Sequence, residues 1–375
     1  MARIAAYVSG HGFGHATRTA EVLRVVRKLE PTLSISVVGS APARLFTDGV
    51  GGPLEVRGLE CDVGLVQRGP LQIDEPASVA RWREFVRDWE QQVEHERQWL
   101  LDTGVDVVLG DVPPLAFEAA ARAGVQSIAL ANFSWDWIYR HLARRDSGML
   151  EAAEWAASAY RKADLLLRLP FSGDLSVFPR IEDVPLVARR PTAAPDELRR
   201  RLGFAGEQVV LLSFGGHAST AFDLRALADL DRFRFVVTDA AGHLPANVTL
   251  LSDDQLNGLR LSYVDLVAAA EVVVTKPGYG IVSDALGAHT RVVYTERGDF
   301  PEYPILVREM AEYLPCVHVS NEDLLAGRLG DALSSVMDKP WPEAPRLDGA
   351  SAVARRLLTM AGIDYIPISA NSGMA

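Results

Sequence analysis

The chain has 375 residues, of which 48% are hydrophobic and 23% are charged, so its composition is that of a globular protein and excludes disorder over most of its length. At about 150 residues per domain, this length predicts two or three domains. The formal net charge of −11 argues against a general nucleic-acid or anionic-membrane binder, because both need a basic surface.

Short apolar runs alternate with helical patterns through the first half of the chain. Five β-rich runs bounded by Gly, Asp or Asn predict buried strands. They are Ile4–Val8, Leu33–Val38, Val105–Leu109, Ser127–Ala131 and Leu165–Leu169. Thr19–Leu29 has apolar residues at helical spacing, and Pro31 ends that helix. Ala77–Leu101 is predicted to be one long amphipathic helix, with Trp82 and Trp89 in the core and not in a binding platform.

Residues 170–195 are rich in proline and irregular, and they form the best candidate linker. Beyond them the alternation resumes, with strands and helices predicted at Val209–Ser213, Phe233–Thr238, Leu261–Ala270, Glu271–Thr275, Ile281–Ala288 and Arg291–Thr295. Two such series predict an α/β protein with two facing doubly wound, Rossmann-like domains. We expect domains at residues 1–185 and 186–365 and a flexible tail at 366–375. Ligands would then bind in the cleft between the domains.

The first loop that could carry chemistry is SGHGFGHATR (residues 9–18), between the first strand and the first helix. Its three glycines allow a sharp turn and close approach to a ligand, and the amides that open the helix favour an anion. The loop matches neither G-x-G-x-x-G nor the Walker A motif. A purely structural role as a loop-capping histidine is plausible for His11 and less so for His15, which lies where the helix begins.

Two further loops follow strands of the first half. Asp111 could cap the helix that starts at Pro114, and its position alone favours that interpretation. Alternatively, it could hold an imidazole proton, orient a general base and stabilise its cation. The cluster NFSWDW (residues 132–137) suits a sugar or another polyhydroxy ligand, although it could equally be a lid packed on the rim of the cleft.

Glycine-rich loops also follow two strands of the second half, SFGGH (residues 213–217) and KPGYG (residues 276–280). A glycine turn that leads into a helix N-terminus can hold a diphosphate. Asp284 lies on the first turn of that helix, where an attached ribose would sit; the alternative is a tight turn followed by a favourable N-terminal acid. Asp229 and Asp231 have the spacing of a D-x-D metal site but look like a helix end, so no metal site is predicted.

Together these loops resemble the GT-B glycosyltransferases. Residues 8–18 and 263–286 resemble the glycine-rich opening and the donor-binding segment of family 28, typified by the peptidoglycan N-acetylglucosaminyltransferase. A closer match is the glycosyltransferase-like N-terminal region of plant L-arabinokinases, which has near-identical counterparts of GHGFGHATR, CDVGLVQ (residues 61–67), NFSWD, SFGG and GYGxVS. The resemblance covers nearly the whole chain, residues 3–330. The kinase half of those proteins, with its Pro-x-x-x-Gly-Leu-Ser-Ser loop, has no counterpart, so kinase activity is not implied.

The resemblance implies an inverting transferase with His15 as catalytic base, supported by Asp111. The residues it assigns to the sugar donor are Gly215, Gly216, Tyr263, Gly278, Tyr279, Gly280, Ser283 and Asp284. Those assigned to the acceptor are Gly12, Gly14, Arg18, Asn132 and Trp135. The co-substrate would be a nucleoside diphosphate sugar, in particular a UDP-sugar, without a metal or other cofactor. The chain departs from the pattern at Lys276, where sugar transferases often have His or Ser, and over residues 297–302, which match the sugar-contacting segment only loosely.

Two other functions fit the same sequence. The fold also hosts nucleotide-sugar epimerases and hydrolases, and a non-catalytic nucleotide-sugar-binding module would keep the same loops. Cys61 and Cys316 allow neither a disulfide framework nor a four-thiolate zinc site, and no run reaches the ~20 apolar residues that span a bilayer. The opening MARIAAYVSG is too short an apolar run for a signal peptide. We therefore expect a cytoplasmic protein that binds small molecules, without nucleic acid or an integral membrane segment and with no indication of its oligomeric state.

Overall fold

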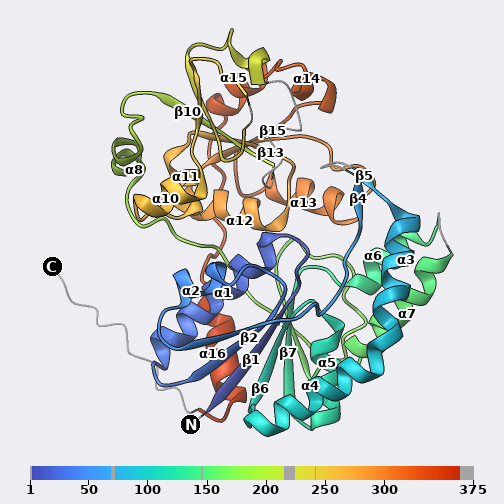
Figure 1. Cartoon of the computed structure of the whole chain (residues 1–375). Coiled ribbons are helices and arrows are strands. Elements are labelled where there is room, and N and C mark those ends of the chain that lie inside the picture. Colours follow the sequence, from blue (N-terminus) through green and yellow to red (C-terminus); the bar gives the residue numbers. More distant parts are fainter. Residues whose placement is uncertain (1, 69–71, 145–146, 215–223, 241, 364–375) are drawn as a thin grey trace.

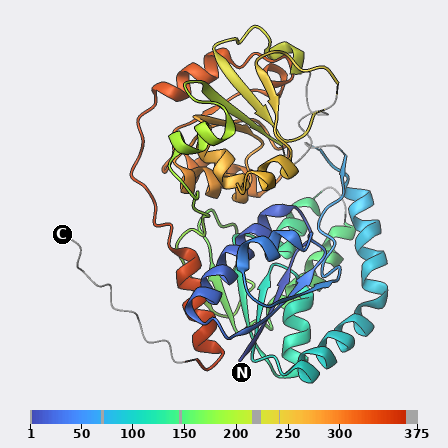
Figure 2. The same ribbon diagram turned by 60° about the vertical axis from the view of Figure 1, so that its left-hand side comes forward.

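The computed structural model describes residues 2–68, 72–144, 147–214, 224–240 and 242–363. The chain forms two α/β domains, one above the other (Figures 1 and 2). The sheet of the first domain has seven strands in the order β3-β2-β1-β6-β7-β8-β9, and that of the second has six in the order β12-β11-β10-β13-β14-β15. All neighbouring strands within these two sheets are parallel. The predicted fold of two doubly wound domains is confirmed.

The first domain contains all five strands predicted for it, each within two residues of the expected bounds. Its strands are β1 (Arg3–Val8), β2 (Ser34–Gly39), β3 (Leu54–Gly58), β6 (Val107–Asp111), β7 (Gln126–Ala131), β8 (Leu165–Arg168) and β9 (Ile181–Asp183), and β4 (Gln67–Arg68) and β5 (Gln72–Ile73) form a small antiparallel ribbon. Its helices are α1 (Phe13–Leu29), α2 (Arg44–Val50), α3 (Glu75–Phe85), α4 (Trp89–Thr103), α5 (Pro114–Ala123), α6 (Trp135–Leu142) and α7 (Gly148–Tyr160).

The second domain repeats the alternation. Its strands are β10 (Gln208–Ser213), β11 (Phe233–Val237), β12 (Val248–Leu250), β13 (Val272–Thr275), β14 (Arg291–Tyr294) and β15 (Cys316–His318). Its helices are α8 (Pro195–Leu202), α10 (Asp253–Gly258), α11 (Tyr263–Ala269), α12 (Tyr279–Ala288), α13 (Glu302–Met310), α14 (Asn321–Leu325) and α15 (Gly330–Asp338), with a 3₁₀ turn at Leu224–Leu227. The central strands of both sheets are buried on both faces, which explains why they read as continuous apolar runs.

The long helix predicted over Ala77–Leu101 is in fact two helices. A 3₁₀ turn at Val86–Asp88 separates α3 from α4. Hydrophobic periodicity missed this break because apolar residues continue through it. The core assignment holds for Trp82, which is buried, and the ring of Trp89 packs at 4.9 Å from that of Trp155.

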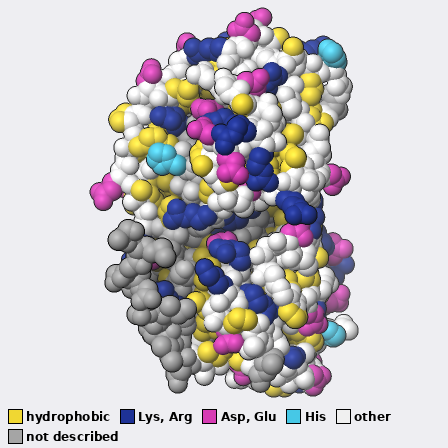
Figure 3. Space-filling model, turned by 90° about the vertical axis from the view of Figure 1, so that its left-hand side faces the viewer, with side chains coloured by type: hydrophobic (Ala, Val, Ile, Leu, Met, Phe, Trp, Pro, Cys, Tyr) yellow, Lys and Arg dark blue, Asp and Glu magenta, His cyan; other side chains and the backbone are white. Residues whose placement is uncertain are grey.

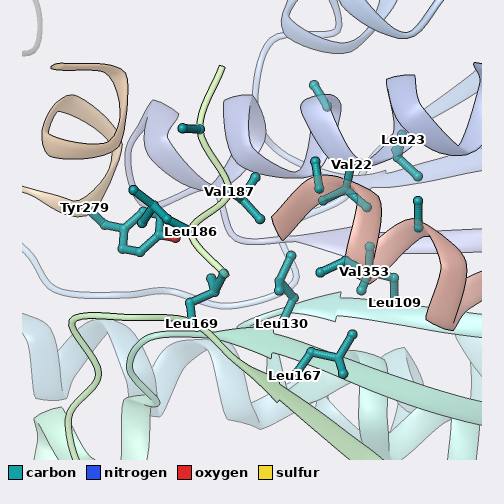
Figure 4. Packing of buried hydrophobic residues seen from close by; sticks show 14 of the residues in the cluster. Val22, Leu23, Leu109, Leu130, Leu167, Leu169, Leu186, Val187, Tyr279 and Val353 are labelled. Atoms are coloured by element: carbon teal, nitrogen blue, oxygen red, sulfur yellow. The ribbon is translucent and has the colours of Figure 1, made fainter. Parts of the chain in front are cut away.

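The last helix, α16 (Gly349–Met360), returns to the first domain. Val353 and Leu357 belong to the same buried cluster as Val22 and Leu23 of α1, and Figure 4 shows Val353 between α1 and the first sheet. From the sequence, this segment was expected in the second domain (residues 186–365). An amphipathic pattern shows which face of a helix is buried, but not which domain buries it. The chain therefore crosses between the domains twice, near residue 187 and again between α15 and α16 (Figure 2).

The surface carries charges of both signs, and on one face Lys and Arg side chains gather along the waist between the domains (Figure 3). An exposed ion pair crosses the domain boundary, with 3.0 Å between Arg44 Nη2 of α2 and Asp253 Oδ2 of α10. Over the described residues, no helix combines the length and the apolar character that crossing a membrane requires. The same residues contain no group of three or more His, Cys, Asp or Glu side chains placed to hold a metal ion.

Candidate functional site

Two helix N-termini meet where the carboxyl ends of the two sheets face each other. Gly12 precedes α1 with φ of +86°, a conformation that side chains rarely tolerate, and this turn directs the chain from β1 into the helix. A Cβ atom on Gly280, in the first turn of α12, would lie 3.1 Å from Cα of Gly14. The absence of a side chain at Gly280 thus lets the two domains approach closely, backbone to backbone, at Gly14. Each helix N-terminus favours an anion nearby.

His15 on the first turn of α1 is bound to Asp111 at the end of β6. The distance between His15 Nδ1 and Asp111 Oδ1 is 2.8 Å. A carboxylate only accepts hydrogen bonds, so Asp111 pairs with the neutral imidazole when its proton is on Nδ1 and Nε2 is unprotonated. Arg18 Nη2, which can only donate, lies 3.1 Å from the same nitrogen and donates to Asp111 Oδ1. Asp111 does not cap the following helix, whose N-cap is Pro113 without a side-chain hydrogen bond. The helix-capping interpretation therefore does not describe Asp111.

Arg18 and Thr19 hold the carboxylate of Asp111 from the same helix. Arg18 Nε and Nη2 donate to its two oxygens at 3.0 and 2.5 Å, and Thr19 Oγ1 donates at 2.8 Å. Burial alone would raise the pKa of Asp111, but the charges of Arg18 and His15 and their hydrogen bonds lower it to about 2. Asp111 is therefore ionised at neutral pH. Arg18 is only 4% exposed and faces Asp111, which favours a positioning role over the acceptor contact suggested by the resemblance.

Asn132, at the end of β7, connects this cluster to the second domain. Its Oδ1 accepts a hydrogen bond from Arg18 Nη1 at 3.0 Å, and its Nδ2 donates to Glu302 Oε1 at 2.6 Å. Glu302 opens α13 and also accepts from Arg297 Nη1 at 2.8 Å. Glu302 ends the segment that matches the sugar-contacting pattern only loosely, and its contact with Asn132 was not predicted because the two residues are 170 positions apart, in different domains.

Trp135 is fully buried and its indole N–H donates to Asp62 Oδ2 at 2.8 Å. Asp62 also accepts from Ser9 Oγ at 3.0 Å, and burial raises the pKa of its carboxyl. The ring of Trp135 stacks on Tyr139 at 5.6 Å. Trp135 therefore supports the first loop through Asp62, which also binds Ser9. Because its side chain is fully buried, Trp135 offers no surface to an acceptor. The segment containing Asp62 carries the resemblance, but no role was assigned to that residue.

His11 is closely packed between Gly64 and Trp135. A Cβ atom on Gly64, whose φ is +56°, would lie 2.5 Å from His11 Nδ1, and the rings of His11 and Trp135 meet edge to face at 5.4 Å. Burial, with smaller contributions from the charges of His15, Arg297 and Lys276, lowers the pKa of His11 to about 3. So weak a base is poorly matched to proton abstraction at neutral pH. The structure therefore favours His15 over His11 for that task.

Five of the residues assigned to the donor lie at the N-terminal end of α12: Gly278, Tyr279, Gly280, Ser283 and Asp284. Gly278 is its N-cap, and Ser283 Oγ donates to the carbonyl oxygen of Gly280 at 2.9 Å. Tyr279 is buried against the first domain beside Leu186, as Figure 4 shows, and the Arg18 guanidinium lies 4.7 Å from the centre of its ring. The glycines are thus near the cleft, whereas the ring of Tyr279 belongs to the domain interface.

Tyr263 and Asp284, which were also assigned to the donor, bind other side chains. Tyr263 donates to Ser213 Oγ at 2.6 Å, and burial raises the pKa of Tyr263 to about 12. Both oxygens of Asp284 accept from Arg189 of the linker, from Nε at 3.0 Å and from Nη2 at 2.5 Å. This ion pair joins α12 to the linker and occupies the carboxylate that was expected to meet a ribose. Gly215 and Gly216 lie outside the described residues.

Comparisons with known proteins agree with this architecture. L-arabinokinase of Arabidopsis thaliana is 36% identical over 329 residues, which make up 86% of this chain and 31% of that protein. The chain thus spans about a third of the length of this relative. An uncharacterized glycosyltransferase of Methanopyrus kandleri is 26% identical over 275 residues, or 69% of this chain and 76% of that one. No family model matches the chain.

Solved structures show the same fold at low sequence identity. The glycotransferase of kitacinnamycin superposes with a TM-score of 0.60 at 17% identity, covering 96% of both chains. UGT71G1 of Medicago truncatula, complexed with UDP-glucose, gives 0.58 at 13% identity, covering 96% of this chain and 93% of the other. The protein therefore has the GT-B glycosyltransferase fold and is homologous to L-arabinokinase and to a glycosyltransferase. The likeness to family 28 in particular stays a prediction.

Proposed function

We propose that the chain is an inverting glycosyltransferase that moves a sugar from a nucleoside diphosphate sugar to an acceptor hydroxyl. The observation that carries the proposal is the contact between His15 Nδ1 and the buried, ionised Asp111, at the edge of the first sheet that faces the glycine-led end of α12. Proton abstraction from a hydroxyl requires an imidazole that is oriented through one ring nitrogen, here Nδ1, and can accept the proton on the other, Nε2.

In the proposed reaction His15 Nε2 takes the acceptor proton as the hydroxyl oxygen attacks the anomeric carbon. The bond from that carbon to the diphosphate oxygen breaks, and the diphosphate leaves with the electron pair. This single displacement inverts the anomeric configuration. Asp111 stabilises the imidazolium, while the N-termini of α1 and α12 favour the charge on the departing diphosphate without a metal ion.

The donor is proposed to be a UDP-sugar, which the complex of UGT71G1 with UDP-glucose supports by analogy of fold. A thermal-shift screen against UDP-, GDP-, ADP- and dTDP-sugars tests this choice, because a ligand at 100 times its Kd stabilises the folded state by about 2.7 kcal/mol. Product analysis with the best donor and a panel of acceptors then tests transfer. Release of free sugar or an epimer from the donor alone would favour the hydrolase or epimerase, and tight binding without turnover would favour a non-catalytic module.

Two glycine variants test whether donor binding needs the close contact between the domains. Gly280→Ala places a Cβ atom 3.1 Å from the backbone of Gly14, so the contact between the domains must give by a few tenths of an ångström, whereas a Cβ on Gly14 would lie 3.7 Å from Gly280 in ordinary contact. We expect Gly280→Ala to weaken UDP binding in calorimetry. Gly14→Ala is the matched control and should leave UDP binding unchanged. Equal behaviour of the two variants would contradict this account of the interface.

Donor affinity should fall above about pH 8. Burial, followed by the charge of Arg297, lowers the pKa of Lys276 to about 8, so its ammonium is lost as the pH rises through that value. The diphosphate of UDP-glucose does not change its charge near this pH, and the Kd, measured by calorimetry from pH 7 to 8.5 so that the uracil ring stays neutral, should rise with the loss of this cation. Lys276→Arg keeps the charge and should give a flat profile. A flat profile in the unsubstituted protein would place Lys276 away from the diphosphate.

A further inference from the structure

We propose that Glu302 of the second domain is a positioning residue for His15, and that it acts through Asn132 and Arg18. This inference rests on the proposed function, since it concerns the orientation of the base. The five side chains form a continuous interdomain network. From Glu302 to Asn132, Arg18, Asp111 and His15, the four successive contacts measure 2.6, 3.0, 2.5 and 2.8 Å.

Every member of this network is withdrawn from water. Asn132 and Asp111 are fully buried, and Glu302, Arg18 and His15 are 3, 4 and 8% exposed. A buried polar group that loses its partner incurs a desolvation penalty, so the orientation of each side chain depends on its neighbour. The network is therefore sensitive to the removal of a single member.

The amide of Asn132 can connect the two charged neighbours in one orientation only. A guanidinium only donates hydrogen bonds and a carboxylate only accepts them, so the amide oxygen must face Arg18 and the amide nitrogen must face Glu302. The reverse orientation would bring two donors together on one side and two acceptors on the other. Glu302 thus fixes the amide, and the amide in turn fixes Arg18 Nη1, which leaves Nε and Nη2 directed at Asp111.

The second domain reaches Arg18 at two places. Glu302 acts through Asn132, and the ring of Tyr279 lies directly against the guanidinium, with 4.7 Å between Arg18 Cζ and the ring centre. Both contacts cross the domain boundary, so both are lost when the domains separate. Arg18 would then be held only from the first domain, by Asp111 and by an Asn132 amide that no longer has its partner in Glu302. The base is consequently aligned when the cleft is closed, which limits activation of water in the open state.

The test compares Glu302→Ala with Arg44→Ala, which removes a different contact across the boundary, the exposed ion pair with Asp253. The first readout is the ¹⁵N spectrum of the imidazole of His15 in the full chain, with and without UDP. The signal is assigned among the eight histidines from its absence in His15→Gln. This readout needs no turnover, so it tests the network even if the proposed function fails. The second readout is kcat and KM for transfer.

We expect Glu302→Ala to replace the single Nδ1-protonated form of His15 by a mixture of tautomers and to lower kcat by about 10- to 100-fold, the size of effect that misplacement of a catalytic group produces. UDP affinity should change little. Arg44→Ala should leave the spectrum and kcat unaltered. Glu302→Gln keeps an oxygen that can accept from Asn132 and should recover part of the loss. Tyr279→Leu removes the ring that lies against Arg18 and should also disturb the His15 signal.

Three results would overturn the proposal. An unchanged His15 spectrum in Glu302→Ala, even with lower kcat, would mean that Glu302 acts by direct contact with the sugar. Equal losses in Glu302→Ala and Arg44→Ala would mean that domain closure alone matters. If Glu302→Ala does not fold, an undisturbed His15 signal in both Glu302→Gln and Tyr279→Leu would leave the network without a positioning role.

Discussion

Replacing His15 with alanine should lower kcat by about 10²–10⁴-fold, the usual contribution of a general base. The affinity for UDP should change little, because the residues proposed to bind the donor lie in the other domain and the backbone N-terminus of α1 is unchanged by the substitution. His15 is the last member of the hydrogen-bond network, so the loss of its ring leaves Asp111 with the three hydrogen bonds from Arg18 and Thr19. The measurement is steady-state transfer with the best donor, together with calorimetry of UDP binding.

The matched control is His11→Ala, which removes the other imidazole of the same loop. Its pKa of about 3 makes it a poor base, so its loss should affect kcat much less than the loss of His15. The double replacement of His15 and Asp111 should resemble His15→Ala alone, because residues that act as a unit have non-additive effects. Normal turnover in His15→Ala would refute the proposed mechanism and leave the non-catalytic binding module as the better interpretation.

The encounter of His15 with Asp111 was predictable because it follows from sheet topology. His15 lies in the loop and helix that follow β1, and Asp111 is the last residue of β6. These two strands are parallel neighbours, and Val8 at the end of β1 lies directly opposite Asp111. Short apolar runs identified those strands, and the carboxyl ends of parallel strands share one edge. The inward direction of Arg18 could also have been found, since it lies three residues after His15 and therefore on the same helix face.

Other features depend on contacts between distant segments that no local pattern encodes. Asn132 and Glu302 are 170 residues apart, and Arg189 and Asp284 are 95 residues apart. Both pairs form only after the domains and the linker have taken their places. Asp284 was expected to meet a ribose because of its place on the helix after the glycine loop, and Asn132 to meet the acceptor because it opens the NFSWDW cluster at a strand end. In the folded chain, their hydrogen-bonding capacity is directed at other side chains.

Asp111→Asn should lower the free energy of unfolding of the first domain by about 3–5 kcal/mol, the cost of removing one partner from a buried ion pair. Arg18 would keep its charge, and an amide offers one acceptor oxygen in place of two. Urea unfolding followed by a probe in the first domain measures this loss. Asp253→Asn is the matched control, because it breaks an exposed ion pair worth about 0–1 kcal/mol.

The pH dependence gives the same prediction an independent test. The pKa of Asp111 is lowered from 3.8 to about 2 in the folded chain, so between these values the unfolded state binds more protons and stability rises with pH. This contribution is fully present above pH 3.8 and is lost as the pH falls through about 2. Asparagine cannot titrate, so the difference in stability between the unsubstituted protein and Asp111→Asn should shrink across this window, while the effect of Asp253→Asn should stay small. A difference that stays constant from pH 5 down to pH 2 would mean that the ionised carboxylate of Asp111 does not compensate the buried charge of Arg18.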